Sequence, residues 1–138
     1  MNKKFSLLTL SFFLSLIFLS ACYVLPQPQT DISVVMHDNS FAPASWRVPA
    51  GARITLHMTN QDTVAHDWTI VYRQSTTPTN VVDPASIYWQ HTIEAGKSED
   101  VQFTAPAVAG DYQVVSSERL AEGMVGKLTV VRLDSSQK

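Results

Sequence analysis

The chain has 138 residues, with ten Lys or Arg, twelve Asp or Glu and a formal net charge of −2. This length allows one domain at most. The basic residues beyond the N-terminus are scattered singly along the sequence, so they form no basic patch in linear order. We therefore expect no nucleic-acid partner.

The N-terminus has the pattern of a secretion signal. Lys3 and Lys4 form a short basic start, and Phe5–Leu19 is almost wholly apolar. The stretch Leu19–Cys22 resembles a bacterial lipobox, in which the cysteine is acylated and becomes the first residue of the mature chain. The alternative is an uncut transmembrane anchor, but the apolar run is short for a bilayer span. We expect an extracytoplasmic protein that is lipid-anchored to a bacterial cell membrane, on the periplasmic or cell-surface side.

Cys22 is the only cysteine in the chain, which excludes an intrachain disulfide. If lipid occupies its sulfur, no thiolate remains for a metal. Loss of the signal leaves eight basic residues against twelve acidic ones, a net charge near −4. The tether that follows has two prolines among polar residues, so we expect it to be extended and not to pack. The expected organisation is a signal peptide at 1–21, acylated Cys22 and tether at 22–30, one domain at 31–133 and a C-terminal tail at 134–138.

From Asp31 onward, short runs of alternating apolar and polar residues are separated by Pro, Gly, Asn and Asp. This pattern predicts an all-β fold of about eight strands, which suits a two-sheet sandwich. The longest stretch without a pattern, Gln74–Ala85, is expected to be a mobile surface loop. The expected strands are Ile32–His37, Trp46–Val48, Arg53–Thr59, Asp67–Tyr72, Tyr88–Ile93, Glu99–Thr104, Asp111–Ser116 and Lys127–Leu133.

The alternation within Arg53–Thr59 assigns faces to individual side chains. Ile54, Leu56 and Met58 fall on one face, because successive side chains of a strand point to opposite sides. His57 falls on the other face, and we expect it to be exposed to solvent.

The closing stretch of the domain, from Gly110 to Val131, carries a spaced motif. Gly110, Tyr112, Gly123, Met124 and Gly126 fit the pattern G-x-Y-x-x-x-Cys-x-x-His-x-x-x-Gly-Met-x-Gly without a gap. This segment resembles the closing segment of the plastocyanin branch of the cupredoxins. The resemblance covers essentially all of residues 32–131. Four short motifs earlier in the chain occur in the order that cupredoxins use: Phe41 to Pro43, Val48–Gly51, Asn60 with His66–Trp68, and Phe103–Pro106. It implies a cupredoxin-like Greek-key β-sandwich.

The resemblance also implies where a type 1 copper site would lie. His66 matches the first imidazole ligand and Met124 the axial thioether, but Ser116 stands at the thiolate position and Arg119 at the second imidazole. A serine hydroxyl is a hard, weak donor to copper, and a guanidinium keeps its proton and its charge. The resemblance therefore implies a copper site that has lost half its ligands, and we expect no cofactor, with copper as the alternative.

A relocated copper site is a further alternative. His37, His91, Met36 and Met58 are residue types that bind copper in extracytoplasmic proteins, but they fall on separate predicted strands. His37 and Met36 are neighbours and so point to opposite faces. Nothing in this spacing predicts that the four side chains converge.

The three tryptophans are candidates either for the core or for a docking surface. Trp68 alternates with His66 and Ile70, so we expect it on the core face. For Trp46 and Trp89 the sequence leaves both interpretations open.

Catalysis is not expected. Ser116 and Ser117 lie beside Glu118 and Arg119, but no histidine is adjacent and no glycine elbow surrounds the serines. The sequence favours a non-enzymatic accessory module with a protein partner near Arg119, and copper binding with electron transfer, or Cu(I) handling, is the alternative. Three carboxylates are candidates to pair with Arg119: Glu118, Glu122 and Asp67.

Overall fold

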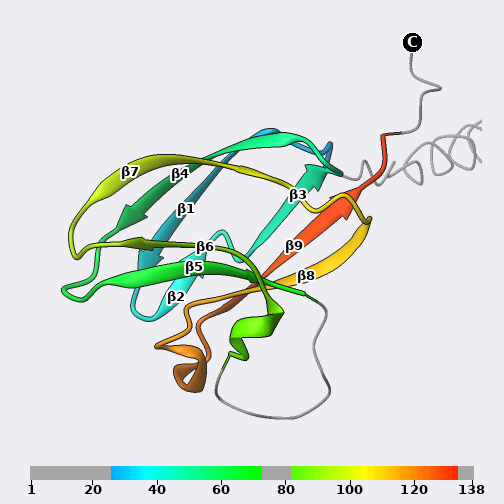
Figure 1. Cartoon of the computed structure of the whole chain (residues 1–138). Coiled ribbons are helices and arrows are strands. Elements are labelled where there is room, and N and C mark those ends of the chain that lie inside the picture. Colours follow the sequence, from blue (N-terminus) through cyan, green and yellow to red (C-terminus); the bar gives the residue numbers. More distant parts are fainter. Residues whose placement is uncertain (1–25, 73–81, 134–138) are drawn as a thin grey trace, which may run out of the picture.

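The computed structural model describes residues 26–72 and 82–133. The predicted signal peptide, Cys22 and the C-terminal tail lie outside these ranges, as does most of the predicted loop Gln74–Ala85. Two β-sheets pack face to face, and the helical segments among the described residues are short 3-10 turns (Figure 1). Within the same two ranges no helix is long and apolar enough to cross a bilayer.

The all-β sandwich expected from the sequence is confirmed. One sheet has the strand order β2-β1-β4-β7 and the other β3-β9-β8-β5-β6. β1 runs parallel to β4 and β3 parallel to β9, whereas the remaining pairs are antiparallel. The first sheet contains β1 (Asp31–His37), β2 (Ser40–Ala42), β4 (Arg53–Asn60) and β7 (Ser98–Thr104). The second contains β3 (Ser45–Pro49), β5 (His66–Val71), β6 (Ile87–Ile93), β8 (Gly110–Val115) and β9 (Val125–Val131), and the 3-10 turns are η2 (Pro84–Ser86) and η3 (Leu120–Glu122).

β2 is the strand that the sequence pattern missed, because its three residues are too few to show alternation. It pairs with β1 through a two-residue turn at Asp38 and Asn39, whose φ angles are 50° and 54°. Positive φ at both central residues is what a tight hairpin turn of type I′ requires, and Asp and Asn tolerate it best after glycine. The Asp-Asn pair is the sequence signal that could have predicted this hairpin.

Two of the three tryptophans lie inside the sandwich and the third packs against the core. Trp68 is fully buried, and Trp46 retains 6% exposure while its Nε1 donates to the carbonyl of Ser33 at 2.9 Å. Trp89 is partly exposed and packs against the core. The rings meet edge to face, with centroids 5.4 Å apart for Trp46 and Trp68 and 6.0 Å apart for Trp68 and Trp89. The core position of Trp68 is confirmed. Trp46 is also a core residue, whereas Trp89 packs on the core and keeps part of its surface exposed.

β4 shows the alternation that the sequence predicts. Ile54, Leu56 and Met58 are each at most 1% exposed, whereas the side chain of His57 is 42% exposed. The prediction that His57 faces solvent is confirmed.

The end of the predicted tether does pack, contrary to the expectation from its composition. The N–H of Gln29 donates to the carbonyl of Arg47 at 2.8 Å, and the carbonyl of Thr30 accepts from the N–H of Thr55 at 2.8 Å. The segment runs beside β3 and β4, whose backbone groups at these positions need partners. Each hydrogen bond satisfies one N–H and one carbonyl group. The composition of the tether indicates only that it has no strand or helix pattern. It does not indicate backbone hydrogen bonds to distant strands, so these contacts were not predicted.

Candidate functional site

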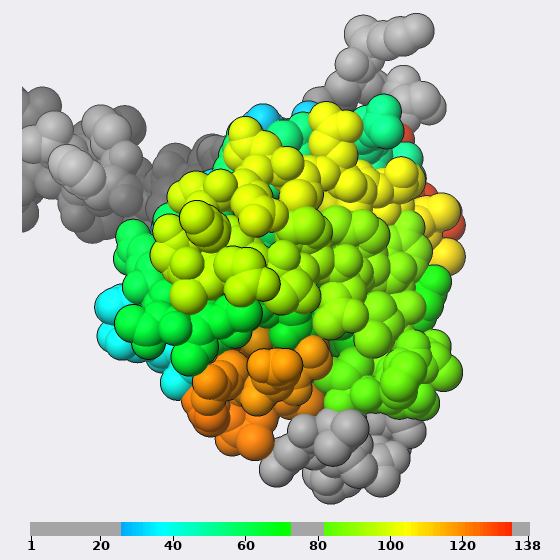
Figure 2. Space-filling view, turned by 60° about the vertical axis from the view of Figure 1, so that its left-hand side comes forward, coloured from blue at the N-terminus to red at the C-terminus, as the bar shows by residue number. Residues whose placement is uncertain are grey.

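Three of the four predicted site residues lie at the ends of adjacent strands in one sheet. His66 begins β5, Ser116 follows β8 and Met124 precedes β9, and each is at most 1% exposed. The N–H of Ser116 donates to the carbonyl of Met124 at 3.2 Å, which fixes the two ends of the connecting loop against each other. This loop, residues 116–124 and orange in Figure 2, forms part of the surface at one end of the molecule.

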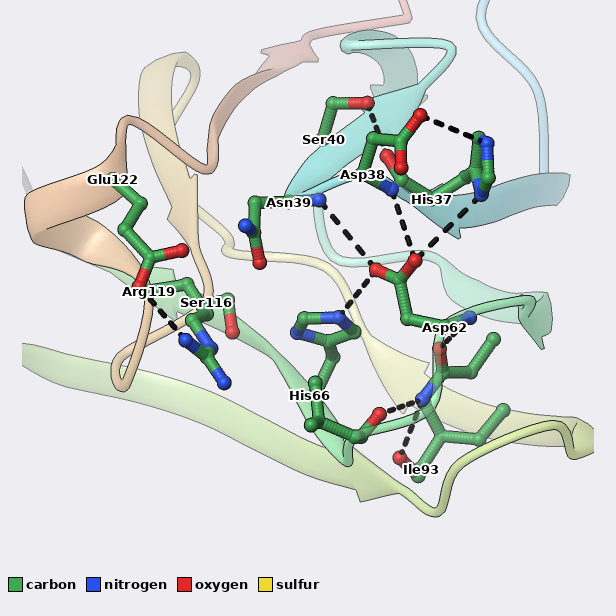
Figure 3. A network of polar contacts seen from close by, with 12 residues as sticks. His37, Asp38, Asn39, Ser40, Asp62, His66, Ile93, Ser116, Arg119 and Glu122 are labelled. Carbon is green, nitrogen blue, oxygen red and sulfur yellow. Dashed lines mark hydrogen bonds and ion pairs between the residues drawn. The ribbon is translucent and has the colours of Figure 1, made fainter.

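Asp62 orients the ring of His66. Its Oδ2 lies 2.7 Å from His66 Nε2, which therefore donates a proton, and in the neutral ring the lone pair is then on Nδ1. The Nδ1 atom is buried and has no hydrogen-bond partner among the described residues. It points away from Asp62, toward the side of the site where Ser116 and Arg119 lie (Figure 3). Carboxylates hold metal-binding histidines in this manner, and the same arrangement also suits a purely packed ring.

Asp62 also ties the β1-β2 hairpin to this end of the sandwich. Its carboxylate accepts from the N–H of Asp38 at 3.0 Å and from the N–H of Asn39 at 3.5 Å. Burial by itself would raise the pKa of Asp62, but hydrogen bonds from Asp38, His66 and Asn39 bring it below its ordinary value. Asp62 is therefore ionised at neutral pH.

Besides Asp62, which the sequence analysis did not single out, the role of Asp67 was also missed, because Asp67 was considered only as a partner for Arg119. The side chain of Asp67 is nearly buried and accepts hydrogen bonds from neutral donors on three segments. Burial would raise its pKa, yet the hydrogen bonds lower it. The donors are Thr69 Oγ1, Gln90 Nε2 at 3.1 Å, Ser116 Oγ at 3.2 Å, Ser117 N at 2.9 Å and Ser117 Oγ at 2.8 Å.

The hydroxyl of Ser116 is hydrogen-bonded to the carboxylate of Asp67. This hydroxyl is fully buried and donates to Asp67 Oδ1, and the adjacent Ser117 donates from both its backbone and its side chain. The start of the loop is thus fixed by hydrogen bonds to one anion.

Arg119 pairs with Glu122, one of the three carboxylates that the sequence left open. The distance from Nη1 to Oε1 is 2.7 Å, and the two side chains are 30% and 43% exposed. Arg119 also borders a hollow of about 200 Å³ whose wall includes Asp38, Asp62 and Val64. A cation, carboxylates and an apolar side chain therefore meet solvent at this end of the sandwich.

The chain was compared with family models, with curated proteins and with solved structures. A model described as "Cupredoxin-like domain" matches residues 7–130. The chain belongs to the cupredoxin-like family. No curated protein matches.

Solved structures of other cupredoxins are similar over most of the chain. Dithionite-reduced auracyanin from Roseiflexus castenholzii is 25% identical with a TM-score of 0.62, over 76% of this chain and 99% of its own. Auracyanin A from Chloroflexus aurantiacus, described as a "blue" copper protein, is 23% identical with a TM-score of 0.63, over 76% and 100%. Reduced rusticyanin is 21% identical with a TM-score of 0.55, over 76% and 82%. The latter two likenesses support the fold alone.

Within residues 26–72 and 82–133, the side chains around His66 do not fit the donor set of type 1 copper. That set is a thiolate, two imidazoles and a weak axial thioether. Around His66 the chain offers one imidazole lone pair and the buried thioether of Met124. The Ser116 hydroxyl is a hard donor already bonded to Asp67, and Arg119 contributes a permanent positive charge.

The four residues considered for a relocated copper site do not form one cluster, because the two histidines face carboxylates while the two methionines are buried. Met36 and Met58 are buried in the core, while His91 faces Glu99, with Nε2 2.9 Å from Oε2. His37 instead joins Asp38 and Asp62, and the three ligand atoms lie within 4.8 Å of one another. These groups could hold a divalent cation. The oxygens of Asp62, however, already accept from N–H donors.

Proposed function

We propose that this cupredoxin works without type 1 copper, as a non-enzymatic binding module that lipid on Cys22 holds at the extracytoplasmic face of a bacterial membrane. The observation that carries the proposal is the buried contact between Ser116 and Asp67. In a copper protein of this family the loop would be fixed by its thiolate–metal bond. Here Asp67 provides the same fixation through hydrogen bonds, so the loop needs no metal to be ordered.

The end of the sandwich that carries Arg119 is the proposed contact surface for a protein partner. The side chain of Arg119 is 30% exposed, and Val64, which lines the same hollow, is 39% exposed. Arginine next to an exposed apolar side chain is the composition that protein interfaces favour. β1 starts at the opposite end of the sandwich, so a lipid attached before it would leave this surface facing away from the bilayer (Figure 1).

The test compares Arg119→Ala with Arg53→Ala in the full-length protein expressed in its native membrane. Arg53 is an exposed arginine at the start of β4, at the opposite end of that strand from Asn60. Chemical cross-linking followed by mass spectrometry should show a partner that Arg119→Ala loses and Arg53→Ala retains. An unchanged set of cross-linked partners in the Arg119 variant would contradict the proposed surface.

Copper binding is the second candidate, and one observation favours it. The lone pair of His66 Nδ1 is buried and unpaired among the described residues. An imidazole and a thioether suit Cu(I) better than Cu(II), so this candidate predicts Cu(I) binding without the intense blue colour of a copper thiolate. Metal analysis of the purified protein beside His66→Ala separates the two functions: copper that the variant loses would support the second, and copper in neither would leave the binding module.

A further inference from the structure

His57 bridges the three strands β1, β4 and β7 on the outer face of the four-stranded sheet. It lies in β4, opposite Ser33 of β1 and Asp100 of β7. Its Nδ1 is 2.7 Å from Asp100 Oδ1, and its Nε2 is 3.1 and 3.2 Å from the two carboxylate oxygens of Asp31. Each ring nitrogen therefore faces a carboxylate on a different neighbouring strand.

This geometry requires a particular protonation state. A neutral imidazole has one N–H donor, so its second nitrogen would turn a lone pair toward a carboxylate. The imidazolium donates from both nitrogens and satisfies both contacts. The hydrogen bond to Asp100, and to a smaller extent the one to Asp31, raises the pKa of His57 above its ordinary value, as expected if the ring is protonated.

The remaining charged groups on this face lie farther away. β1 also carries His37 and β4 carries Arg53, each four residues along the strand from the level of His57 and so roughly 13 Å away. β7 contributes Asp100 and no other charged side chain to this face, where Ser98 and Gln102 flank it. Asp31 and Asp100 are thus the groups that set the charge state of His57.

Asp31 is the first residue of β1, where the N-terminal segment joins the domain. The adjacent Thr30 carbonyl accepts from the N–H of Thr55, which lies two residues before His57 on the same strand. Aside from these contacts and the bond from Gln29 to Arg47, the described part of this segment is mostly exposed. The bridge from His57 to Asp31 is therefore placed to hold the start of β1 on the sheet.

We propose that His57 is a proton-operated clamp on the start of β1. With the ring protonated, Asp31 and Asp100 are both bonded and the first residues of the domain are fixed. When the ring loses its proton, the remaining N–H keeps the shorter bond to Asp100, the longer bond to Asp31 is lost and the N-terminal end of β1 frays from β4. The clamp depends on neither the lipid on Cys22 nor the absence of copper.

The direction of the pH effect follows from linkage. A group whose pKa is higher in the folded than in the unfolded protein stabilises the fold fully below its unfolded pKa, near 6.5 for histidine. That contribution is lost as the pH rises through the folded pKa of His57. The clamp is closed on the acid side and open on the alkaline side.

The experiment uses the isotope-labelled full-length protein in detergent, with His57→Gln and His91→Gln as a matched pair of variants at partly exposed histidines that each face a carboxylate. NMR should show that His57 titrates above 6.5 and that Asp31→Asn or Asp100→Asn lowers its pKa. The protection factor of the Thr55 amide, corrected for intrinsic exchange, should fall as His57 deprotonates. This fall should persist in His91→Gln and vanish in His57→Gln.

Two results would overturn the clamp. One is a His57 pKa at or below 6.5 in the folded protein. The other is a Thr55 protection factor that falls with pH equally in His57→Gln. If His57→Gln does not fold, Asp31→Asn removes the same bridge from the other side and serves the same comparison.

Discussion

At the scale of single residues, a buried carboxylate organises the candidate site. Asp67 holds two consecutive serines from a segment about fifty residues away in sequence, the Ser116 contact spanning 49 positions. A buried anion is costly unless donors surround it, and here the donors come from Thr69, Gln90 and the two serines. The loop that starts at Ser116 is therefore held in place by hydrogen bonds from neutral donors to the Asp67 carboxylate.

Replacing Asp67 with Asn should lower the free energy of unfolding by about 2 to 3 kcal/mol. The hydrogen bonds to a charged acceptor are lost, and the side-chain NH₂ of the new Asn is directed at groups that are themselves hydrogen-bond donors. Chemical denaturation at neutral pH measures the change. Asp111→Asn is the control, since Asp111 lies on the same sheet with a side chain 55% exposed. Its expected change is within about 0.5 kcal/mol. Equal losses in both variants would contradict the role given to Asp67.

At the scale of elements, the glycines of the closing segment have different physical roles. Gly123 ends η3 with φ of 84°, a left-handed conformation that side chains rarely adopt. Gly126 needs space: a Cβ there would lie 2.8 Å from the ring of Trp46. The motif that carries the family resemblance is thus maintained by backbone geometry and packing, and neither role depends on copper.

The same segment allows a test of the residue correspondence. The double variant Ser116→Cys and Arg119→His should bind Cu(II) and turn blue, because it adds a thiolate and a second imidazole beside His66 and Met124. Absorption and electron paramagnetic resonance spectra detect such a centre. The single variant Ser116→Cys, which lacks the second imidazole, is the control. A folded double variant that takes up no copper would show that the correspondence misplaces the loop.

At the scale of the whole molecule, the proposed function assigns different tasks to the two ends of the sandwich. The chain joins the domain at the start of β1, and the candidate surface around Arg119 lies at the other end, next to the last residues of β1 (Figures 1 and 3). β1 connects these ends directly and spans roughly 20 Å, as seven extended residues do. The proposed anchor at one end would therefore present the other end to the proposed partner.

Cys22→Ala tests the anchor. The variant should lose labelling by fatty acids and move from the membrane fraction to the soluble extracytoplasmic fraction, because acyl chains supply the proposed membrane affinity. Metabolic labelling and fractionation measure both effects. Ser20→Ala, a change beside the same cleavage position that keeps the thiol, is the control. Membrane retention of an unlabelled Cys22→Ala protein would favour an uncut transmembrane anchor instead.

The sequence by itself determined the all-β class, the faces of β4, the core position of Trp68 and the family of the fold. These features depend on local alternation and on a motif within one continuous segment. Tertiary structure decided which partners the polar side chains take: Asp67 with Ser116 and Ser117, Arg119 with Glu122, and His57 with Asp31 and Asp100. The partners of Asp67 and His57 follow from strand order and register, which bring distant segments within 3.2 Å of one another and which no local pattern specifies. Arg119 and Glu122 are three residues apart, and the conformation of the η3 turn decides that pair.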